Sequence, residues 1–370
     1  MILQNIQNIL ETWAPKDIAW EQDNTGLQIG SPNQHVKNIL ITLDVNSEVV
    51  EEARKKKADL IISHHPLLYK PLKSVNFDQR NGNLVQKLIL YKIALYSIHT
   101  NLDFTKDGVS FTLAEQIGLK DIDFLYKDKQ TQKKITVFVP PEYTQRVSSA
   151  MADAGAGIIG NYESCAFETD GVGMYKPGIG STPFKGKAGN LEHITETRLE
   201  MTAPSWKVNS VVSAMKAVHP YEEVAYDIYE LSNFSNDYGA GAIGILPGRM
   251  NKNKFLKHIG HSLKLHVVKY SGTGNTKIER VAVCGGGGSD LLSAAIRQNA
   301  DAFITGDISY HRFEEAEDKI IMIDAGHFET EHPIIHKIAV RLKNEFTKHS
   351  DDIKIFESKA PSNNIQYFIP

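Results

Sequence analysis

Two adjacent histidines, His64 and His65, stand where an apolar run ends and could take part in metal chemistry. The run at 59–62 is short and bounded by polar residues, which indicates a buried strand. Ligands of open α/β folds bind where strands end. Neighbouring side chains at such an end diverge, so the two imidazoles can serve two metal ions instead of chelating one. Taken alone, the pair fits an ordinary loop equally well.

Three further candidate ligands follow other predicted strands. His327 and Glu331 are four residues apart where a strand gives way to a helix, so both can face one point. Such a pair can chelate a divalent ion; the alternative is a histidine that hydrogen-bonds the glutamate. Asp103 follows a predicted strand at 93–98, and its two oxygens can bridge two ions. The alternative there is an aspartate in an Asx-turn.

Together the five residues form a ligand set that is typical of a two-metal site. Three imidazoles and two carboxylates suit Zn, Fe, Mn, Co or Ni, whereas softer metals prefer thiolates. Five protein ligands are too many for one catalytic ion that keeps an open position. Paired ions ~3.5–4 Å apart recur in hydrolytic enzymes, where one ion activates water and the other holds the substrate oxygen. The set therefore predicts two divalent ions per chain.

Other residues near predicted strand ends could move protons or hold a phosphate. His99 and His311 could each act as a general acid or base, or orient a ligand. For His311 we favour an orienting role or substrate contact over direct ligation. The run Gly285–Gly288, between a strand and a helix, could cradle a phosphate on its backbone N–H groups. It lacks the Lys-Ser/Thr of a P-loop, and tight strand-to-helix packing is the alternative explanation.

Strand and helix patterns alternate in the first and last thirds of the chain, which predicts a largely parallel α/β core. The first third has helical patterns at 4–13, 47–57 and 82–91 and strand patterns at 39–43, 60–63 and 93–98. The last third has strand patterns at 280–284, 301–305 and 320–323 and an amphipathic helix from about residue 331.

The middle of the chain has a different order of elements. Strand-like and helical segments follow as β-α-β-β-α-β at 135–139, 142–153, 162–168, 197–202, 208–218 and 224–231, between polar joints at 127–134 and 232–237. This order is that of a ferredoxin-like domain. We therefore expect a three-layer α/β core formed by residues 1–126 and 240–370, with an inserted ferredoxin-like α+β domain at 127–239.

Composition excludes several classes of protein. A chain of 370 residues predicts more than one domain, and a net charge of −3 gives no basic footprint for nucleic acid or an anionic membrane. Two cysteines, Cys165 and Cys284, do not suggest a disulfide framework. No run approaches the ~20 apolar residues that span a bilayer, and a signal peptide is not recognisable at the N-terminus. We expect a cytoplasmic protein without a membrane partner.

The motifs in both outer thirds resemble those of the GTP cyclohydrolase I type 2 homologs, also called Nif-three-like dinuclear metal-centre proteins. The matching stretches are Trp20–Gly30, Ser63–Leu67, His99–Asp103, Thr305–Asp307, His311 and Gly326–Glu331. The resemblance implies metal ligands at His64, His65, Asp103, His327 and Glu331. It also implies a toroidal homohexamer whose sites face an internal cavity, where a small molecule could bind.

The middle segment resembles the PII/CutA-type trimeric module that some bacterial members of this family contain. The matching stretches are 219–223, 160–162 and 171–173. The resemblance implies that trimers of this module cap the openings of the ring. Two roles remain possible for this module: it could sense a small molecule, or it could be a lid without a ligand of its own.

These observations favour a metal-dependent hydrolase that acts on a nucleotide-like or other phosphorylated small molecule. His311 or His99 would move protons, and the family name implies opening of the GTP ring at purine C8. The first alternative is an assembly that stores, delivers or senses metal without turnover. The second is a nucleic-acid-binding ring, which the net charge of −3 disfavours.

Overall fold

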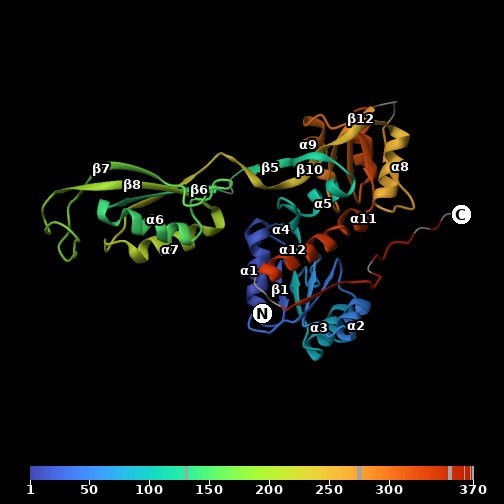
Figure 1. The fold of residues 1–370 in the computed structure, drawn as a ribbon, viewed down its shortest axis with the longest axis horizontal. Helices are drawn as coiled ribbons and strands as arrows, with labels where there is room; N and C mark the ends of the chain where they lie inside the picture. The colour runs from blue at the N-terminus through green and yellow to red at the C-terminus, as the bar shows by residue number, and fades with distance from the viewer. Residues whose placement is uncertain (130–131, 273–276, 349–351, 362, 367, 369–370) are drawn as a thin grey trace. The chain divides into compact units, whose positions relative to one another are not determined.

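The chain divides into two compact units in the computed structural model, which describes residues 1–129, 132–272, 277–348, 352–361, 363–366 and 368 (Figure 1). Unit 1 comprises residues 1–127 and 236–370, and unit 2 comprises residues 128–235. Unit 1 thus combines the two ends of the chain, and all five candidate metal ligands belong to it. No helix among the described residues is both long and apolar enough to cross a membrane.

The first sheet of unit 1 is a mixed sheet that is covered on both faces. Its strand order is β1 (Gly26–Ile29), β4 (Ala94–Ser97), β3 (Leu60–Ser63), β2 (Asn38–Thr42) and β15 (Lys354–Glu357). Only β1 is antiparallel to its neighbour. One face packs against α1 (Leu3–Trp13) and α12 (Ile334–Lys348), and the other against α2 (Ser47–Lys55) and α3 (Arg80–Leu90). Burial on both faces explains the continuous apolar runs of its parallel strands.

The second sheet of unit 1 repeats this layered arrangement. Its order is β11 (Lys269–Ser271), β14 (Ile321–Asp324), β13 (Ala302–Thr305), β12 (Lys277–Val283), β10 (Phe234–Asn251) and β5 (Lys120–Lys129). Strands β12, β13 and β14 are parallel, with β10 and β11 antiparallel beside them. Its faces pack against α5 (Val109–Gln116) with α8 (Lys252–Ser262), and against α9 (Leu292–Arg297) with α10 (Tyr310–Ala316).

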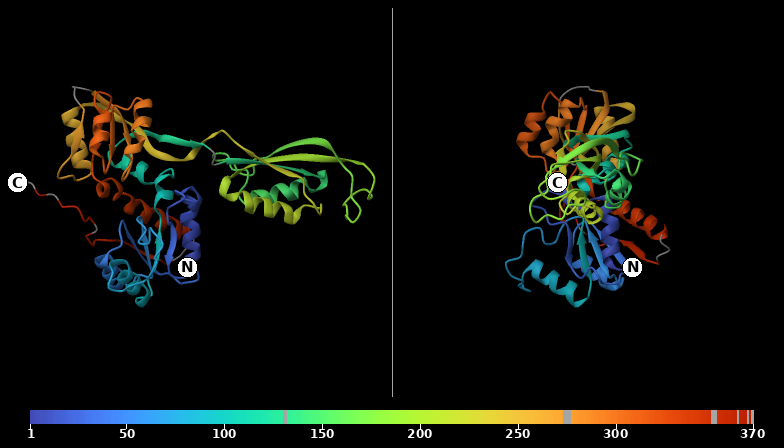
Figure 2. Two further views of the ribbon diagram at one scale, coloured as in Figure 1. Left: turned by 180° about the vertical axis from the view of Figure 1, so that it is seen from behind. Right: turned by 90° about the vertical axis from the view of Figure 1, so that its left-hand side faces the viewer.

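The two sheets of unit 1 exchange edge strands, which the sequence did not predict. Strand β15 comes from the end of the chain and joins the first sheet, whereas β5 comes from the N-terminal third and joins the second. The helix expected from about residue 331 is α12, which begins at Ile334, and a separate short helix, α11 (His327–Glu331), precedes it. Helices α11 and α12 both contact α5, and α12 also contacts β2, so these helices link the two sheets (Figures 1 and 2).

Unit 2 contains a four-stranded antiparallel sheet with two helices. Its elements in chain order are β6 (Gln132–Val139), α6 (Thr144–Asp153), β7 (Phe167–Tyr175), β8 (Glu192–Pro204), α7 (Val208–Val218) and β9 (Tyr226–Glu230). The strand order is β7-β8-β6-β9, and α6 and α7 pack into one apolar core with the sheet.

One expectation for the middle segment needs correction. The strand expected at 162–168 begins at Phe167 and continues to Tyr175, because the glycines at 171 and 173 remain paired with β8. The polar runs at 127–134 and 232–237 contain the borders between the two units, which fall after Lys127 and after Ser235. Both runs are partly strand, since β5 extends to Lys129, β6 begins at Gln132 and β10 begins at Phe234, while residues 130–131 lie outside the described residues. Polar side chains do not prevent strand pairing where a strand is exposed.

Candidate metal centre

The candidate ligands lie at the carboxyl ends of parallel strands in both sheets. The ends of β2, β3 and β4 are in register, since Thr42 pairs with Ser63 and Ser63 with Ser97. His64 and His65 follow β3 directly, and their backbone N–H groups donate to the carbonyls of residues 42 and 43 at 3.1 and 2.9 Å. This pairing fixes the backbone beneath the two imidazoles.

Four imidazole rings form one cluster that draws on both sheets. The ring centroids of His64 and His65 are 5.0 Å apart, and His99 lies 5.3 Å from the first and 5.5 Å from the second. His327, at the start of α11, lies 5.4 Å from His65. The structure therefore brings together histidines from distant parts of the chain.

Two of the four rings are oriented by groups of the first sheet. His64 donates from Nδ1 to the carbonyl oxygen of Ile98 at 2.8 Å, and His65 donates from Nδ1 to Oδ1 of Asp44 at 2.9 Å. Because each acceptor fixes a proton on Nδ1, Nε2 is the nitrogen left for a metal ion. Metal-binding histidines commonly have such a hydrogen bond on their other nitrogen.

The other two rings are oriented in the same way by carboxylates. His99 donates from Nδ1 to both oxygens of Asp23 at 2.9 Å, and His327 donates from Nδ1 to Oδ2 of Asp307 at 2.7 Å. All four histidines of the cluster therefore direct Nε2 away from an acceptor that holds Nδ1. This shared orientation is the one that metal coordination requires.

Glu331, at the end of α11, contacts histidines from both sheets. Its Oε2 lies 2.9 Å from Nε2 of His65, and its Oε1 lies 3.2 Å from Nε2 of His327 and 3.8 Å from Nε2 of His64. Oδ1 of Asp103, in the short helix α4 (Thr100–Asp103), lies 3.6 Å from Nε2 of His64. The five residues predicted as ligands thus meet at one place, with Glu331 between them.

Some buried polar atoms of this cluster have no hydrogen-bond partner among the described residues. They are Nε2 of His64 and Oδ1 of Asp103, which lie 3.6 Å apart. An orphaned buried polar atom costs about 1–3 kcal/mol, so a native protein rarely leaves two together. Nitrogen and oxygen donors of this kind fit a divalent ion. Ligand atoms lie within 4.8 Å of one another in two overlapping groups: His64, His65 and His99, and His65, His327 and Glu331.

The two carboxylates of the cluster titrate in opposite directions. Burial would raise the pKa of Glu331, but contacts with His327, His64 and His65 hold it well below its ordinary value. Burial raises the pKa of Asp103 to about 7, because the opposing attraction of His64 does not compensate. Glu331 therefore supplies a fixed negative charge, which favours a cation beside it.

Two of the clustered histidines, His65 and His327, have raised pKa values, so protons compete with a metal ion for their ring nitrogens. Burial alone would lower the pKa of His65, but hydrogen bonds with Asp44 and Glu331 raise it to about 10. The contact with Glu331 is the largest cause that raises the pKa of His327 to about 9. A metal ion that binds these nitrogens must displace the protons, so metal affinity depends on pH.

The glycine run Gly285–Gly288 packs beneath this cluster. Gly286 has a φ of +63°, and a Cβ there would collide with the carboxylate of Glu331. The N–H groups of residues 285, 286 and 288 donate to the hydroxyls of Ser110, Thr330 and Thr305. Since these donors are engaged within the protein, the geometry supports the packing explanation over a phosphate cradle.

The two histidines predicted as proton carriers lie in different surroundings. His99 is in the cluster, where its ring contacts His64, His65 and Tyr69. The side chain of His311 is 87% exposed, and its contacts in the described part of the chain are to Glu314 and the ring of Tyr310. Its role in proton transfer stays a prediction.

Sequence reasoning did not identify the three carboxylates that orient the histidines. Asp44 and Asp307 follow β2 and β13, so their position after parallel strands was a usable signal. Asp23 precedes β1 and lacked that signal, although its carboxylate accepts hydrogen bonds from His99 and from both the N–H and the hydroxyl of Thr100.

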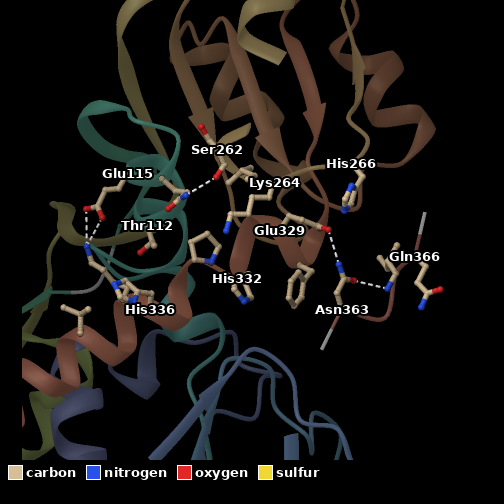
Figure 3. Close-up of a pocket in the computed structure, with 17 residues that line it drawn as sticks. Thr112, Glu115, Ser262, Lys264, His266, Glu329, His332, His336, Asn363 and Gln366 are labelled. Atoms are coloured by element: carbon tan, nitrogen blue, oxygen red, sulfur yellow. Dashed lines mark hydrogen bonds and ion pairs between the residues drawn. The ribbon is translucent and has the colours of Figure 1, made fainter. Parts of the chain in front are cut away.

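A cavity of about 1070 Å³ is lined by other residues of the same helical segment. Phe328, Glu329 and His332 line it, together with residues of α5, α8, α12 and the C-terminal segment, and Glu329 accepts a hydrogen bond from Asn363 (Figure 3). None of the four clustered histidines is among its lining residues. This cavity is therefore separate from the candidate metal centre.

Comparisons with known proteins agree with the motifs. Residues 1–364 match the sequence profile of the family described as Duf34/NIF3 (NGG1p interacting factor 3). A protein of Bacillus subtilis named GTP cyclohydrolase 1 type 2 homolog is 38% identical over 367 residues, which covers 97% of each chain. A protein of the same name from Halalkalibacterium halodurans is 39% identical over 326 residues, 88% of each chain. The crystal structure of a Bacillus cereus protein related to NIF3 has a TM-score of 0.84 and 36% identity, covering 100% of this chain and 99% of that one.

Proposed function

The chain belongs to the Duf34/NIF3 family, and we propose that it is a metal-dependent hydrolase with a dinuclear centre at His64, His65, Asp103, His327 and Glu331. The main support is the shared orientation of the clustered histidines, each with Nδ1 held by an acceptor and Nε2 turned away from that acceptor. Four rings oriented in this way beside the carboxylates of Asp103 and Glu331 are difficult to explain by packing alone.

The contacts among the proposed ligands centre on Glu331. Its carboxylate contacts Nε2 of His65, His327 and His64, and Nε2 of His64 also lies 3.6 Å from Oδ1 of Asp103. These five side chains would hold the ions. When bound, paired divalent ions (Zn, Fe, Mn, Co or Ni) would supply Lewis acidity and an activated water. The buried ligands would hold the ions, while the remaining polar groups would handle substrate and protons.

His99 is the stronger candidate for moving protons. Burial would raise the pKa of Asp23, but hydrogen bonds from His99 and Thr100 lower it to about 2, so this carboxylate stays ionised. It holds the proton on Nδ1 of His99 and leaves Nε2 to accept or donate a second proton. His311 is the second candidate, and its exposure would allow it to act only on a substrate that reaches α10.

The substrate we propose is a nucleotide-like or other phosphorylated small molecule, since relatives are named GTP cyclohydrolase 1 type 2 homolog. The test is to load the purified chain with Zn, Mn or Fe and assay GTP together with a panel of phosphoesters. Turnover that His65→Ala abolishes supports the hydrolase. Turnover no higher than that of His65→Ala on every compound would contradict it.

A metal-binding assembly without turnover is the second candidate. The side chain of His64 is fully buried and that of Glu331 is 4% exposed, as in a site built to retain ions. Two tightly bound ions per chain with no activity on the panel would favour this function. A nucleic-acid-binding ring is less favoured by the net charge of −3, and binding that does not weaken with added salt would exclude it.

We also propose that residues 127–239 are an inserted ferredoxin-like domain of the PII/CutA type and that the chain forms a homohexamer. The order of elements and the antiparallel sheet of unit 2 support the first proposal, and the family resemblance supports the second. Light scattering on the full chain should give six copies; a monomer would contradict the assembly. The free thiols of Cys165 and Cys284 are consistent with a reducing cytoplasm.

A further inference from the structure

A second cavity lies beside the candidate metal centre, on the segment that follows His65. It has a volume of about 430 Å³, and its polar and aromatic lining residues are Tyr69, Lys70, Lys73, Ser74, Gln79 and Asn81. Small-molecule sites commonly have volumes of about 300–1,000 Å³. The volume therefore suits a small polar group of a ligand.

Tyr69 borders both this cavity and the histidine cluster. It lines the cavity, is 43% exposed, and its ring centroid lies 6.2 Å from that of His99 in an edge-on arrangement. The neighbouring Leu68 is held on both sides, because its N–H donates to Gln28 at 2.9 Å and its carbonyl accepts from Asn24 at 2.5 Å. The backbone is thus held at the residue before Tyr69, at the border between the cavity and the cluster.

The chemistry of the cavity fits an anion. Lys70 and Lys73 are exposed, and neither forms an ion pair with a described residue. Their ammonium groups, with the hydroxyl of Ser74 and the amides of Gln79 and Asn81, are donors suited to phosphate oxygens. A tyrosine face beside them can stack a planar ring.

We propose that this cavity binds the phosphate end of a nucleotide whose base stacks on Tyr69. The inference rests on the proposed function, because it names how that site would receive its substrate. The base would lie beside His99, next to the metal ligands, while the phosphate would extend to Lys70 and Lys73. A monophosphate is the appropriate probe, since a triphosphate would compete with the protein for the metal.

The test is calorimetric binding of guanosine monophosphate, guanosine and ribose 5-phosphate to the metal-loaded full chain. Tyr69→Leu should weaken both guanine compounds about tenfold, or about 1.4 kcal/mol, and leave ribose 5-phosphate unchanged; Tyr69→Phe should keep wild-type affinity. The double variant Lys70→Ala/Lys73→Ala should weaken the two phosphates about tenfold and leave guanosine unchanged. Tyr162→Leu and Lys176→Ala, at exposed positions of unit 2, are matched controls.

Two results would overturn the proposal. One is absence of binding by all three compounds to protein that holds its metal ions. The other is a variant that weakens all three compounds equally, which indicates a general structural effect. Failure of the hydrolase proposal would look different: the binding pattern would be present without turnover.

Discussion

Metal loading should release protons, because two of the proposed ligands bind protons tightly in the metal-free chain. The pKa of His65 is raised to about 10 and that of His327 to about 9. A metal ion needs the neutral imidazole, so each bound proton must leave when the metal binds. The experiment therefore varies the pH at which the metal is added.

The magnitude follows from these values. At pH 8 both imidazoles are more than about nine-tenths protonated, so full loading should release roughly two protons per chain. The product of the two metal affinities should then rise roughly 100-fold per pH unit near pH 8.

The assay is calorimetric titration with Zn²⁺ in two buffers of different ionisation enthalpy. The difference between the two binding enthalpies gives the number of protons that metal binding releases. His327→Gln should reduce the count by about one. His336→Gln is the matched control, because His336 also donates from Nδ1 to a carboxylate, Glu357, at 2.9 Å but is exposed and outside the cluster. Release of less than one proton per fully loaded chain, or an equal loss in His336→Gln, would refute the reasoning.

Three further predictions concern stability and packing. In the metal-free chain, the raised pKa values of His65 and His327 stabilise the fold fully below about pH 6.5, and this contribution is lost as pH rises through about 9 and 10. The metal-free chain should therefore become less stable against urea as the pH rises over that range, whereas the metal-loaded chain should not. An equal loss of stability in the metal-loaded chain would contradict this prediction. Gly286→Ala should lower metal affinity, because the new Cβ would displace Glu331. Gly160→Ala is the control: it adds a similar backbone strain of about 1–2 kcal/mol at a φ of +57°, but its Cβ has no atom within 4 Å, so metal affinity should be kept. Equal metal affinities in the two variants would contradict the proposed packing of Gly286 against Glu331. Removing metal with a chelator should lower the unfolding temperature, since free metal at 100 times its Kd stabilises by about 2.7 kcal/mol, and an unchanged temperature would show that the fold does not depend on the ions.

The sequence alone determined the local elements and the residue types of the candidate ligands. Apolar runs at 39–43, 60–63 and 301–305 correspond to β2, β3 and β13, because a strand buried on both faces needs a continuous apolar sequence. The helical pattern at 47–57 corresponds to α2, which Asn46 caps because its side chain accepts from the N–H of Val49. Positions after such strands singled out the five candidate ligands, since strand ends place side chains at one edge of a sheet.

Only the tertiary structure showed which of the residues that follow predicted strands lie in the cluster. His99 and His311 both follow strand patterns, yet one lies in the cluster and the other is exposed. The exchange of β5 and β15 depends on pairing between distant segments, which no local periodicity encodes. The same holds for Asp23, whose hydrogen bond to His99 forms only when the sheet is assembled. Residue type and position therefore predicted which groups could bind metal, whereas long-range backbone pairing fixed which of them meet and in what orientation.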